Sequence, residues 1–281
     1  MWHHAVMLLR RIARALGIGR LYLWLKEGPH AGRVRSQGVY RRAHATALLG
    51  RGYGASGWVE SGEAALLERI GRKHPDMGLI FDVGANVGGW SQEVSRVWPK
   101  ARIHAFEPAG ETYAQLEAAT KGINVRAVNV ALSDEPGEAT LHAVEGQTGL
   151  TSLHDRDLAA HGMEMTATET VRLMRLDDYA AEQGIDHIDF LKIDAEGHDL
   201  AVLKGASGMI ERGAIDLIQF EFGGANIDSR TFLRDFVRFL EPRYRILRLM
   251  KDGLEPLVYG EREEVFVTSN FLAERVTDTA L

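Results

Sequence analysis

The stretch that decides the fold is FDVGANVGGW, residues 81–90. An apolar run from Leu79 to Val83 leads into it and predicts a buried strand. Gly84 and Gly88 then let the backbone turn sharply and let a ligand lie against it. Open α/β sheets bind ligands at the carboxyl ends of their strands, so we expect a ligand site at this turn.

Outward from this stretch, short apolar runs alternate with helical patterns. The further strands are expected at 102–106, 124–130, 188–193 and 215–222, and the helices at 91–98, 111–120, 199–212 and 229–240. This alternation predicts a doubly wound, mostly parallel α/β sheet. Two later apolar stretches, 244–250 and 265–268, flank Asp252-Gly253 and predict an antiparallel pair that closes the sheet. Alternating residues within 138–176 predict a small β insertion after the third strand.

Composition and charge set the broad class. The chain has 281 residues, is 45% hydrophobic, and contains no cysteine, which excludes disulfides, thiol nucleophiles and cysteine-ligated metals. The net charge is −6, but residues 1–53 hold ten of the 33 basic residues and one of the 39 acidic residues, so the remainder carries −15. An acidic body argues against a nucleic-acid partner, and a basic arm favours an anionic surface.

The N-terminal arm, residues 1–55, is expected to be partly helical and to precede a single domain at 56–281. Residues 3–16 have the spacing of an amphipathic helix, and its apolar stripe needs cover from the main domain, a second subunit or a membrane surface. The segment from Gly28 to Gly62 is expected to be a linker or loop. No run is long enough to cross a bilayer, so we expect a cytoplasmic protein, with peripheral membrane contact or a homo-oligomer as roles for the arm.

The turn after the first strand is an imperfect dinucleotide motif. Gly84, Asn86 and Gly89 give G-x-N-x-x-G, with asparagine where close approach to a pyrophosphate requires glycine. Asp82 would repel a pyrophosphate but could hold a cationic amine. The expected ligand is therefore a zwitterion with a sulfonium, held by Asp82 and lying against Gly84 and Gly88.

Two further strand ends complete this ligand site. Glu107 ends the second strand, 23 residues after Gly84, where an acid accepts the hydroxyls of a ribose. Ser133 and Asp134 follow the third strand, and their turn could take an adenine. Each residue also has a plain structural interpretation, as a strand-end acid or a turn.

The fourth strand ends in the densest group of polar residues, DAEGHD at 194–199. Asp194 and His198 are the candidate general bases, and Glu196, with Glu221 at the end of the fifth strand, is a candidate for substrate binding. Asp194, Glu196 and His198 could instead bind a divalent metal, but Gly197 breaks their alternation and we expect no metal. His3, His4, His142 and His154 have no recognisable spacing and stay unassigned.

Taken together, these segments resemble the FkbM family of S-adenosylmethionine-dependent methyltransferases. The resemblance runs from about Phe81 to Leu203 and rests on the order and spacing of DVGANVG (82–88), FEP (106–108), ALSD (131–134), TGLTSL (148–153), LDDY (176–179) and IDFLKIDAEGH (188–198). Ala195 and Asp199 depart mildly from the family pattern, and the first 75 residues lie outside it.

The resemblance implies the seven-stranded class I methyltransferase sheet, S-adenosylmethionine as cofactor, and O-methylation of a sugar, glycolipid, polysaccharide or secondary metabolite. The residues that it implies around the cofactor are Asp82, Gly84, Asn86, Gly88, Glu107 and Ser133. The acceptor would be a small molecule or a lipid-linked glycan. Two other functions stay open: a catalytically silent binding module in a biosynthetic complex, and a nicotinamide-dependent oxidoreductase, which Asp82 and Asn86 disfavour.

Overall fold

The computed structural model describes residues 33, 37–55 and 57–276. The chain divides into two compact units, residues 1–51 and 52–281. In the first unit, the structure describes one helix, α3 (Gln37–Gly50), where the glycine-rich sequence predicted a loop. That prediction was wrong because the good helix formers between Gly38 and Gly50 outweigh the flanking glycines. The amphipathic helix expected at 3–16 lies outside the described residues. None of the described helices is long and apolar enough to cross a bilayer.

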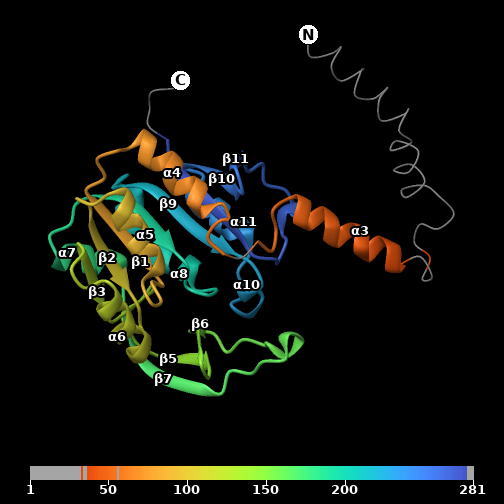
Figure 1. Ribbon diagram of the computed structural model, residues 1–281, viewed down its shortest axis with the longest axis horizontal. Helices are drawn as coiled ribbons and strands as arrows, with labels where there is room; N and C mark the ends of the chain where they lie inside the picture. Colours follow the sequence, from red (N-terminus) through yellow and green to blue (C-terminus); the bar gives the residue numbers. More distant parts are fainter. Residues whose placement is uncertain (1–32, 34–36, 56, 277–281) are drawn as a thin grey trace, which may run out of the picture. The chain divides into compact units, whose positions relative to one another are not determined.

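The second unit is built on an eight-stranded sheet with the order β11-β10-β12-β9-β8-β1-β2-β3 (Figure 1). The five strands from β9 to β3 in this order are parallel, and the other three join through antiparallel pairs. The strands are β1 (Leu79–Val83), β2 (Arg102–Phe106), β3 (Val125–Val128), β8 (Ile188–Ile193), β9 (Ile215–Phe222), β10 (Tyr244–Met250), β11 (Gly253–Pro256) and β12 (Ser269–Arg275).

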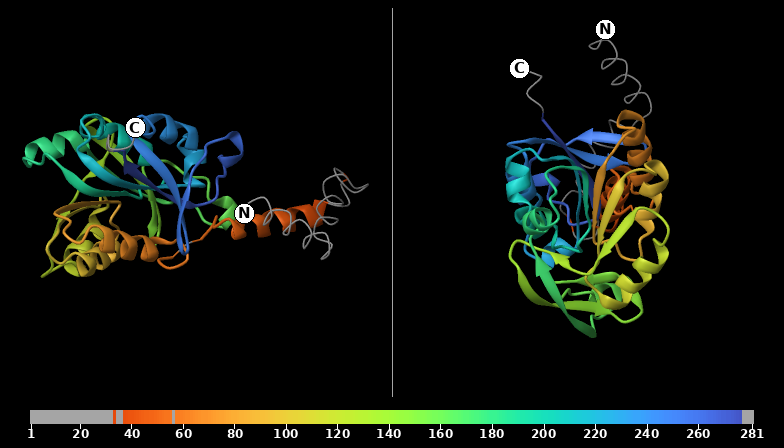
Figure 2. Two further views of the ribbon diagram at one scale, coloured as in Figure 1. Left: turned by 90° about the horizontal axis from the view of Figure 1, so that it is seen from above. Right: turned by 90° about the vertical axis from the view of Figure 1, so that its left-hand side faces the viewer.

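Helices cover both faces of this sheet, as Figure 2 shows from two sides. Adjacent residues of a strand point to opposite faces, so Ile80 packs with the helices of one face and Phe81 with those of the other. The first group contains α4 (Glu63–Lys73) and α5 (Gly89–Val97); the second contains α7 (Leu176–Glu182), α8 (Asp199–Gly205), α9 (Ser207–Glu211) and α11 (Leu233–Leu240). Helix α6 (Gly110–Ala119) lies beside β3.

A second, four-stranded sheet forms the predicted insertion. Its order is β4-β7-β5-β6, with β4 (Ala131–Leu132), β5 (Gly137–Val144), β6 (Gln147–Ser152) and β7 (Ala167–Met174). In Figure 1 the green strands β5, β6 and β7 lie together at one end of the unit. The 3-10 helix η2 (Ala159–His161) lies in the connection from β6 to β7.

Strand order fixes where a ligand can bind. From β1 the chain moves outward through β2 and β3, then returns to place β8 against the other side of β1. This reversal between β1 and β8 is a topological switch point, and the crevice outside its strand ends is the usual ligand site of open α/β sheets. The predicted site residues at 84, 107 and 194 follow β1, β2 and β8.

Three details of the prediction need correction. The strand expected at 265–268 lies instead at Ser269–Arg275, between β9 and β10. The main sheet has eight strands, because β11 forms a hairpin with β10 across Lys251 and Asp252. The helix expected at 229–240 begins only at Leu233, as α11, and Arg230 has a left-handed backbone (φ 55°) between α10 (Ala225–Asp228) and α11.

Candidate active site

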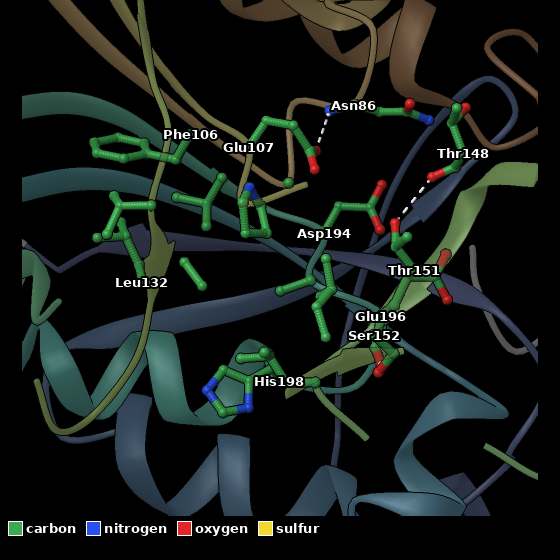
Figure 3. A pocket seen from close by; sticks show the side chains of 18 of the residues that line it. Asn86, Phe106, Glu107, Leu132, Thr148, Thr151, Ser152, Asp194, Glu196 and His198 are labelled. Carbon is green, nitrogen blue, oxygen red and sulfur yellow. Dashed lines mark hydrogen bonds between the residues drawn. The ribbon is translucent and has the colours of Figure 1, made fainter. Parts of the chain in front are cut away.

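A cavity opens at the carboxyl ends of β1, β2 and β8, beneath the insertion (Figure 3). The space between its walls, including the part open to solvent, is about 740 Å³. Its polar lining includes six predicted site residues: Gly84, Asn86, Glu107, Asp194, Glu196 and His198. The insertion adds residues that the sequence reasoning did not assign: Thr148, Gly149, Thr151, Ser152 and Leu153.

The turn after β1 lies close against the backbone at the end of β8. Gly84 has φ 74°, and a Cβ atom built on it would lie 1.8 Å from the backbone oxygen of Asp194. Glycine is therefore required here by the β8 backbone, a reason different from the ligand contact that the sequence predicted. Asn86 also has a left-handed backbone (φ 48°), a strain that clusters at functional sites. Gly88 caps α5 at φ 86° and does not line the cavity.

Glu107 presents an oriented carboxylate to the cavity. Its Oε2 accepts a hydrogen bond from the backbone N–H of Asn86, and its Oε1 accepts one from that of Ala109, both at 3.0 Å. Burial raises the pKa of Glu107 to about 7, although the two N–H groups act to lower it. The carboxylate is thus fixed in direction and keeps lone pairs for a ligand.

Asp82, predicted to hold a ligand's amine, lies in the core of the domain. It is fully buried, accepts a hydrogen bond from Ser91 Oγ at 2.7 Å, and lies 3.5 Å from Lys192 Nζ. Asp82 is not among the residues that line the cavity. Its role is to join β1, α5 and β8.

Lys192 is a residue that the sequence reasoning missed. Its side chain is 6% exposed, and its ammonium lies 3.3 Å from Asp194 Oδ2 and 3.5 Å from Asp82 Oδ1. Burial acts to lower the pKa of Lys192, but the carboxylates of Asp194 and Asp82 outweigh it and raise the pKa above its usual value. The signal was available, since Lys192 interrupts an otherwise apolar run just before Asp194.

The β8 turn carries a group of acids that repel one another. Burial, reinforced by Asp194, raises the pKa of both Glu196 and Asp199 to about 7. The pKa of Glu221 is raised well above its usual value by the same causes, although Glu221 lies behind the cavity lining. Glu196 has φ 47° and pairs with Arg156 of the insertion. Of these acids, Asp194 and Glu196 line the cavity, whereas Asp199 and Glu221 do not.

The end of β6 and the residues that follow it contact this turn through alternate residues. Ser152 Oγ donates to the backbone oxygen of Glu196 at 2.8 Å, and Arg156 pairs with Glu196 and lies 3.9 Å from Asp228 Oδ2. Between them, His154 Nε2 lies 3.3 Å from His198 Nδ1. None of these three insertion residues was predicted, although their period-two spacing matches an extended chain with one face toward the site.

Ser133 and Asp134 lie outside the cavity lining. Ser133 Oγ lies 2.9 Å from His198 Nε2 and 3.1 Å from Asp134 Oδ1. The structure thus connects these two residues to His198 rather than to the cofactor position predicted for them.

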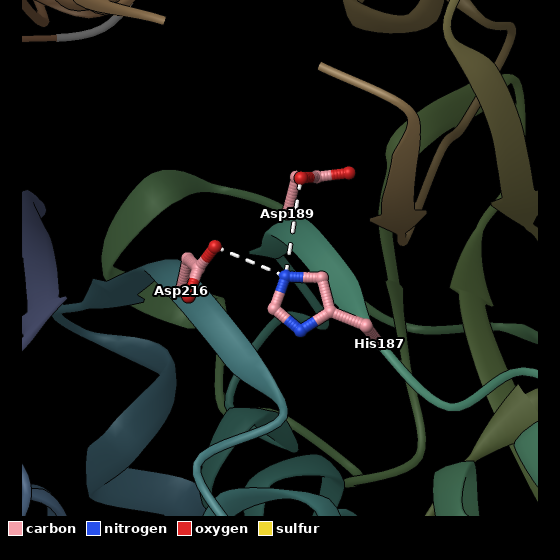
Figure 4. Close-up of side chains that lie close together, drawn as sticks. All are labelled: His187, Asp189 and Asp216. Atoms are coloured by element: carbon pink, nitrogen blue, oxygen red, sulfur yellow. Dashed lines mark hydrogen bonds and ion pairs between the residues drawn. The ribbon is translucent and has the colours of Figure 1, made fainter.

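A second polar cluster lies at the opposite, amino ends of β8 and β9 (Figure 4). His187 Nε2 is 3.0 Å from Asp216 Oδ2 and 3.9 Å from Asp189 Oδ1. Among the described residues, these three side chains are the group of potential metal ligands whose ligand atoms all lie within 4.8 Å of one another. The ligand atoms of Asp194, Glu196 and His198 form no such group. Asp216 also pairs with Arg275, and Asp189 accepts two backbone hydrogen bonds. Ion pairs and strand contacts therefore account for this cluster.

Comparison with known proteins adds curated relatives that share part of this chain. Methyltransferase sdnD of Sordaria araneosa is 34% identical over 47% of this chain and 61% of its own length. The 31-O-demethyl-FK506 methyltransferase FkbM of Streptomyces tacrolimicus is 32% identical over 45% of this chain and 58% of its own length. The hexuronic acid methyltransferase AglP of Haloferax volcanii is 24% identical over 72% of this chain and 78% of its own length. The chain spans about three fifths of the length of the first relatives it matches.

The family model for the methyltransferase FkbM domain matches residues 82–245. The match begins at the end of β1 and ends in β10, so it contains every residue of the cavity lining and most of the parallel sheet. The chain belongs to the FkbM methyltransferase family.

Proposed function

We propose that this protein transfers a methyl group from S-adenosylmethionine to a hydroxyl group of a sugar, glycolipid, polysaccharide or secondary metabolite. The observation that carries the proposal is the Glu107 carboxylate, buried, oriented by two backbone N–H groups and facing a cavity at the switch point of the sheet. S-adenosylmethionine is the cofactor of the family, and when bound it supplies a methyl group activated by a sulfonium.

The residues present fit this cofactor. Glu107 offers acceptor lone pairs to a pair of ribose hydroxyls. The side-chain oxygen of Asn86 is buried and has no hydrogen-bond partner among the described residues, so it can accept from the cofactor's amino group. Phe106, Val130 and Leu132 supply an apolar wall for the adenine. Together these residues would orient the cofactor along the ends of β1 and β2.

The acceptor would bind between the β8 turn and the insertion. The carboxylates of Asp194 and Glu196 accept hydrogen bonds, and a hydroxyl-bearing acceptor offers the donors they need. During transfer, the acceptor oxygen bonds to the methyl carbon as the carbon–sulfur bond breaks and its electrons go to sulfur. The hydroxyl proton passes to a base, for which Asp194 and His198 are the lining candidates. Positioning and exclusion of water then supply most of the acceleration.

The relatives support an oxygen acceptor without identifying it. The name of the Streptomyces relative specifies an O-demethyl substrate, and that of the Haloferax relative specifies a hexuronic acid. One is a secondary metabolite and the other a sugar acid, so an acceptor screen should contain both classes.

The test is transfer of tritium from methyl-labelled S-adenosylmethionine to a panel of neutral sugars, uronic acids, lipid-linked glycans and polyketides. We expect a labelled O-methyl product from the intact chain and a rate about 10 to 100-fold lower from Glu107→Gln at subsaturating cofactor. The matched control is Glu111→Gln, an exposed acid in the first turn of α6. A folded protein that binds the cofactor but labels nothing would favour the silent binding module.

A further inference from the structure

The side chains that line the cavity are, among the described residues, acidic or uncharged (Figure 3). The ionisable ones are the carboxylates of Glu107, Asp194 and Glu196 and the imidazole of His198, and none of the described lining residues is a lysine or an arginine. Burial, followed by His154, lowers the pKa of His198 to about 4, so this ring is neutral at pH 7. A molecule in the cavity therefore meets a carboxylate on the β2 side and two carboxylates on the β8 side.

Two cations lie behind this lining, and each is shared by two carboxylates of the domain. The ammonium of Lys192 is 3.3 Å from Asp194 Oδ2 and 3.5 Å from Asp82 Oδ1. Arg156 pairs with Glu196 and with a second carboxylate, on α10. The two basic side chains are 6% and 11% exposed. Both cations are thus committed to acids of the protein, and neither lines the cavity where it could bind an anionic ligand.

The acids around the β8 turn outweigh the cation beside them. Burial raises the pKa of Glu221, and the carboxylates of Asp194, Glu196 and Asp199 raise it further, while Lys192 has the smallest effect, in the opposite direction. The net potential at this turn is therefore negative. A further anion placed there would add to the repulsion, which is costly where water is largely excluded.

The hydrogen-bonding groups of the lining also favour a ligand that donates. Thr151 already donates its hydroxyl proton to the backbone oxygen of Thr148, and Ser152 donates its own to the backbone oxygen of Glu196. The side chain of Asp194 is 38% exposed, and no described residue donates a hydrogen bond to its Oδ1. A carboxylate only accepts, so a hydroxyl group finds a partner here.

The chemistry of the transfer agrees with this preference. A hydroxyl acceptor loses its proton as its oxygen bonds to the methyl carbon and the electrons of the carbon–sulfur bond pass to sulfur. A carboxylate of the lining can take that proton. A carboxylate acceptor has no proton to lose, would become a methyl ester, and would need a cation to hold it. The described lining supplies proton acceptors and no cation.

We propose that the acceptor is uncharged where it enters this cavity: a neutral hydroxyl compound, with no carboxylate, phosphate or sulfate beside the methylated hydroxyl. Asp194 and Glu196 enforce this choice by repelling anions and accepting hydrogen bonds. This inference rests on the proposed function and names the substrate class of the same site. It separates this chain from the Haloferax relative, whose name specifies a hexuronic acid.

The first test measures the charge of the acceptor region without an acceptor. Sinefungin is a cofactor analogue that carries an ammonium on carbon in place of the methyl on sulfur, whereas S-adenosylhomocysteine carries neither group. In calorimetric titration of the full chain at pH 7, we expect sinefungin to bind at least about 10-fold more tightly than S-adenosylhomocysteine. Equal or weaker binding of sinefungin would overturn the proposal.

Variants assign this preference to the named acids. Glu196→Gln and Asp194→Asn keep the shape of each side chain and remove its charge. Each should reduce the preference for sinefungin by about threefold or more, and melting temperatures identify the variants that fold. The control is Glu111→Gln, an exposed acid in the first turn of α6, which should keep the full preference. A preference unchanged in both charge-removing variants would contradict the role given to Asp194 and Glu196.

The second test compares acceptors of one shape and different charge. The methyl glycosides of galactose, galacturonic acid and galacturonamide, and the same three compounds of the glucose series, are offered with methyl-labelled S-adenosylmethionine. We expect kcat/KM for the neutral sugar and the amide to exceed that for the acid by at least about 100-fold. Glu196→Gln should narrow this difference. Transfer to the acid that equals transfer to its amide would refute the proposal.

Failure of the proposed function would look different from failure of this inference. If the protein is not a methyltransferase that uses S-adenosylmethionine, neither sinefungin nor S-adenosylhomocysteine binds. If both bind but no sugar is labelled, the relative affinity of the two analogues still decides whether the acceptor region is negative.

Discussion

The buried ion pair between Lys192 and Asp82 should be among the most sensitive contacts in the domain. Lys192→Met removes the ammonium and leaves Asp82 with Ser91 as its hydrogen-bond donor, at a site where the Asp82 residue is 0% exposed. Breaking a buried pair by removing one partner costs about 3–5 kcal/mol, because a desolvated charge is left behind. For a domain of this size, that loss corresponds to about 6–20 °C in melting temperature.

The same variant should depend on pH in a definite direction. Burial already raises the pKa of Asp82 above its usual value, against the opposing effect of Lys192, so loss of the lysine raises it further. A raised carboxyl pKa favours the protonated group in the folded state, and stability is lost as pH rises through that pKa. The deficit of Lys192→Met should therefore be larger at pH 8 than at pH 5.

Urea denaturation followed by circular dichroism, at both pH values, measures this deficit. Lys204→Met, at an exposed lysine of α8, is the matched control and should change stability by less than about 0.5 kcal/mol. The double variant Asp82→Asn, Lys192→Met should recover part of the loss. A deficit below about 1 kcal/mol in Lys192→Met, or one that does not vary with pH, would refute the reasoning.

Three further outcomes follow from the site. Gly84→Ala should abolish folding or cofactor binding, because its Cβ would meet the Asp194 backbone oxygen at 1.8 Å, whereas Gly89→Ala, with open space around it, should be tolerated; thermal unfolding of both variants checks this. Cofactor affinity should rise between pH 6 and pH 8 as Glu107, with a pKa of about 7, ionises and becomes a full acceptor; calorimetric titration should find the rise absent in Glu107→Gln. Arg156→Leu should loosen the insertion, seen as faster amide hydrogen exchange in residues 150–158 with β8 unchanged, while Arg172→Leu, at an exposed site on β7, should not.

Much of the parallel sheet could be predicted from sequence, because its strands are short apolar runs buried on both faces. The predicted bounds 79–83, 102–106, 188–193 and 215–222 match β1, β2, β8 and β9. The last strand could not be placed in the same way. Residues 269–275 are more polar than a central strand usually is, and only the pairing of β12 with β9 and β10 shows that they belong to the sheet.

Sequence reasoning also placed the cavity, since Gly84, Glu107 and Asp194 each follow a strand that a parallel sheet brings to one edge. It could not tell which polar side chains at that edge face the ligand. Asp82 lies two residues before Gly84 and faces the core because the strand alternates, and its pairing with Lys192 could be assigned only once β1 and β8 were aligned. His154 was missed because its contact with His198 spans 44 residues and depends on how the insertion folds back.

The most direct test of the central claim is calorimetric titration of the full chain with S-adenosylmethionine and with its demethylated product. The account predicts one site for each ligand, with affinity reduced about 10 to 100-fold in Glu107→Gln through loss of charge-assisted hydrogen bonds worth about 1.5–3 kcal/mol. If either ligand binds, a free ligand concentration one hundred times its Kd should raise the free energy of unfolding by about 2.7 kcal/mol. A cooperatively folded protein that binds neither ligand, or binds them equally well without the Glu107 carboxylate, would contradict it.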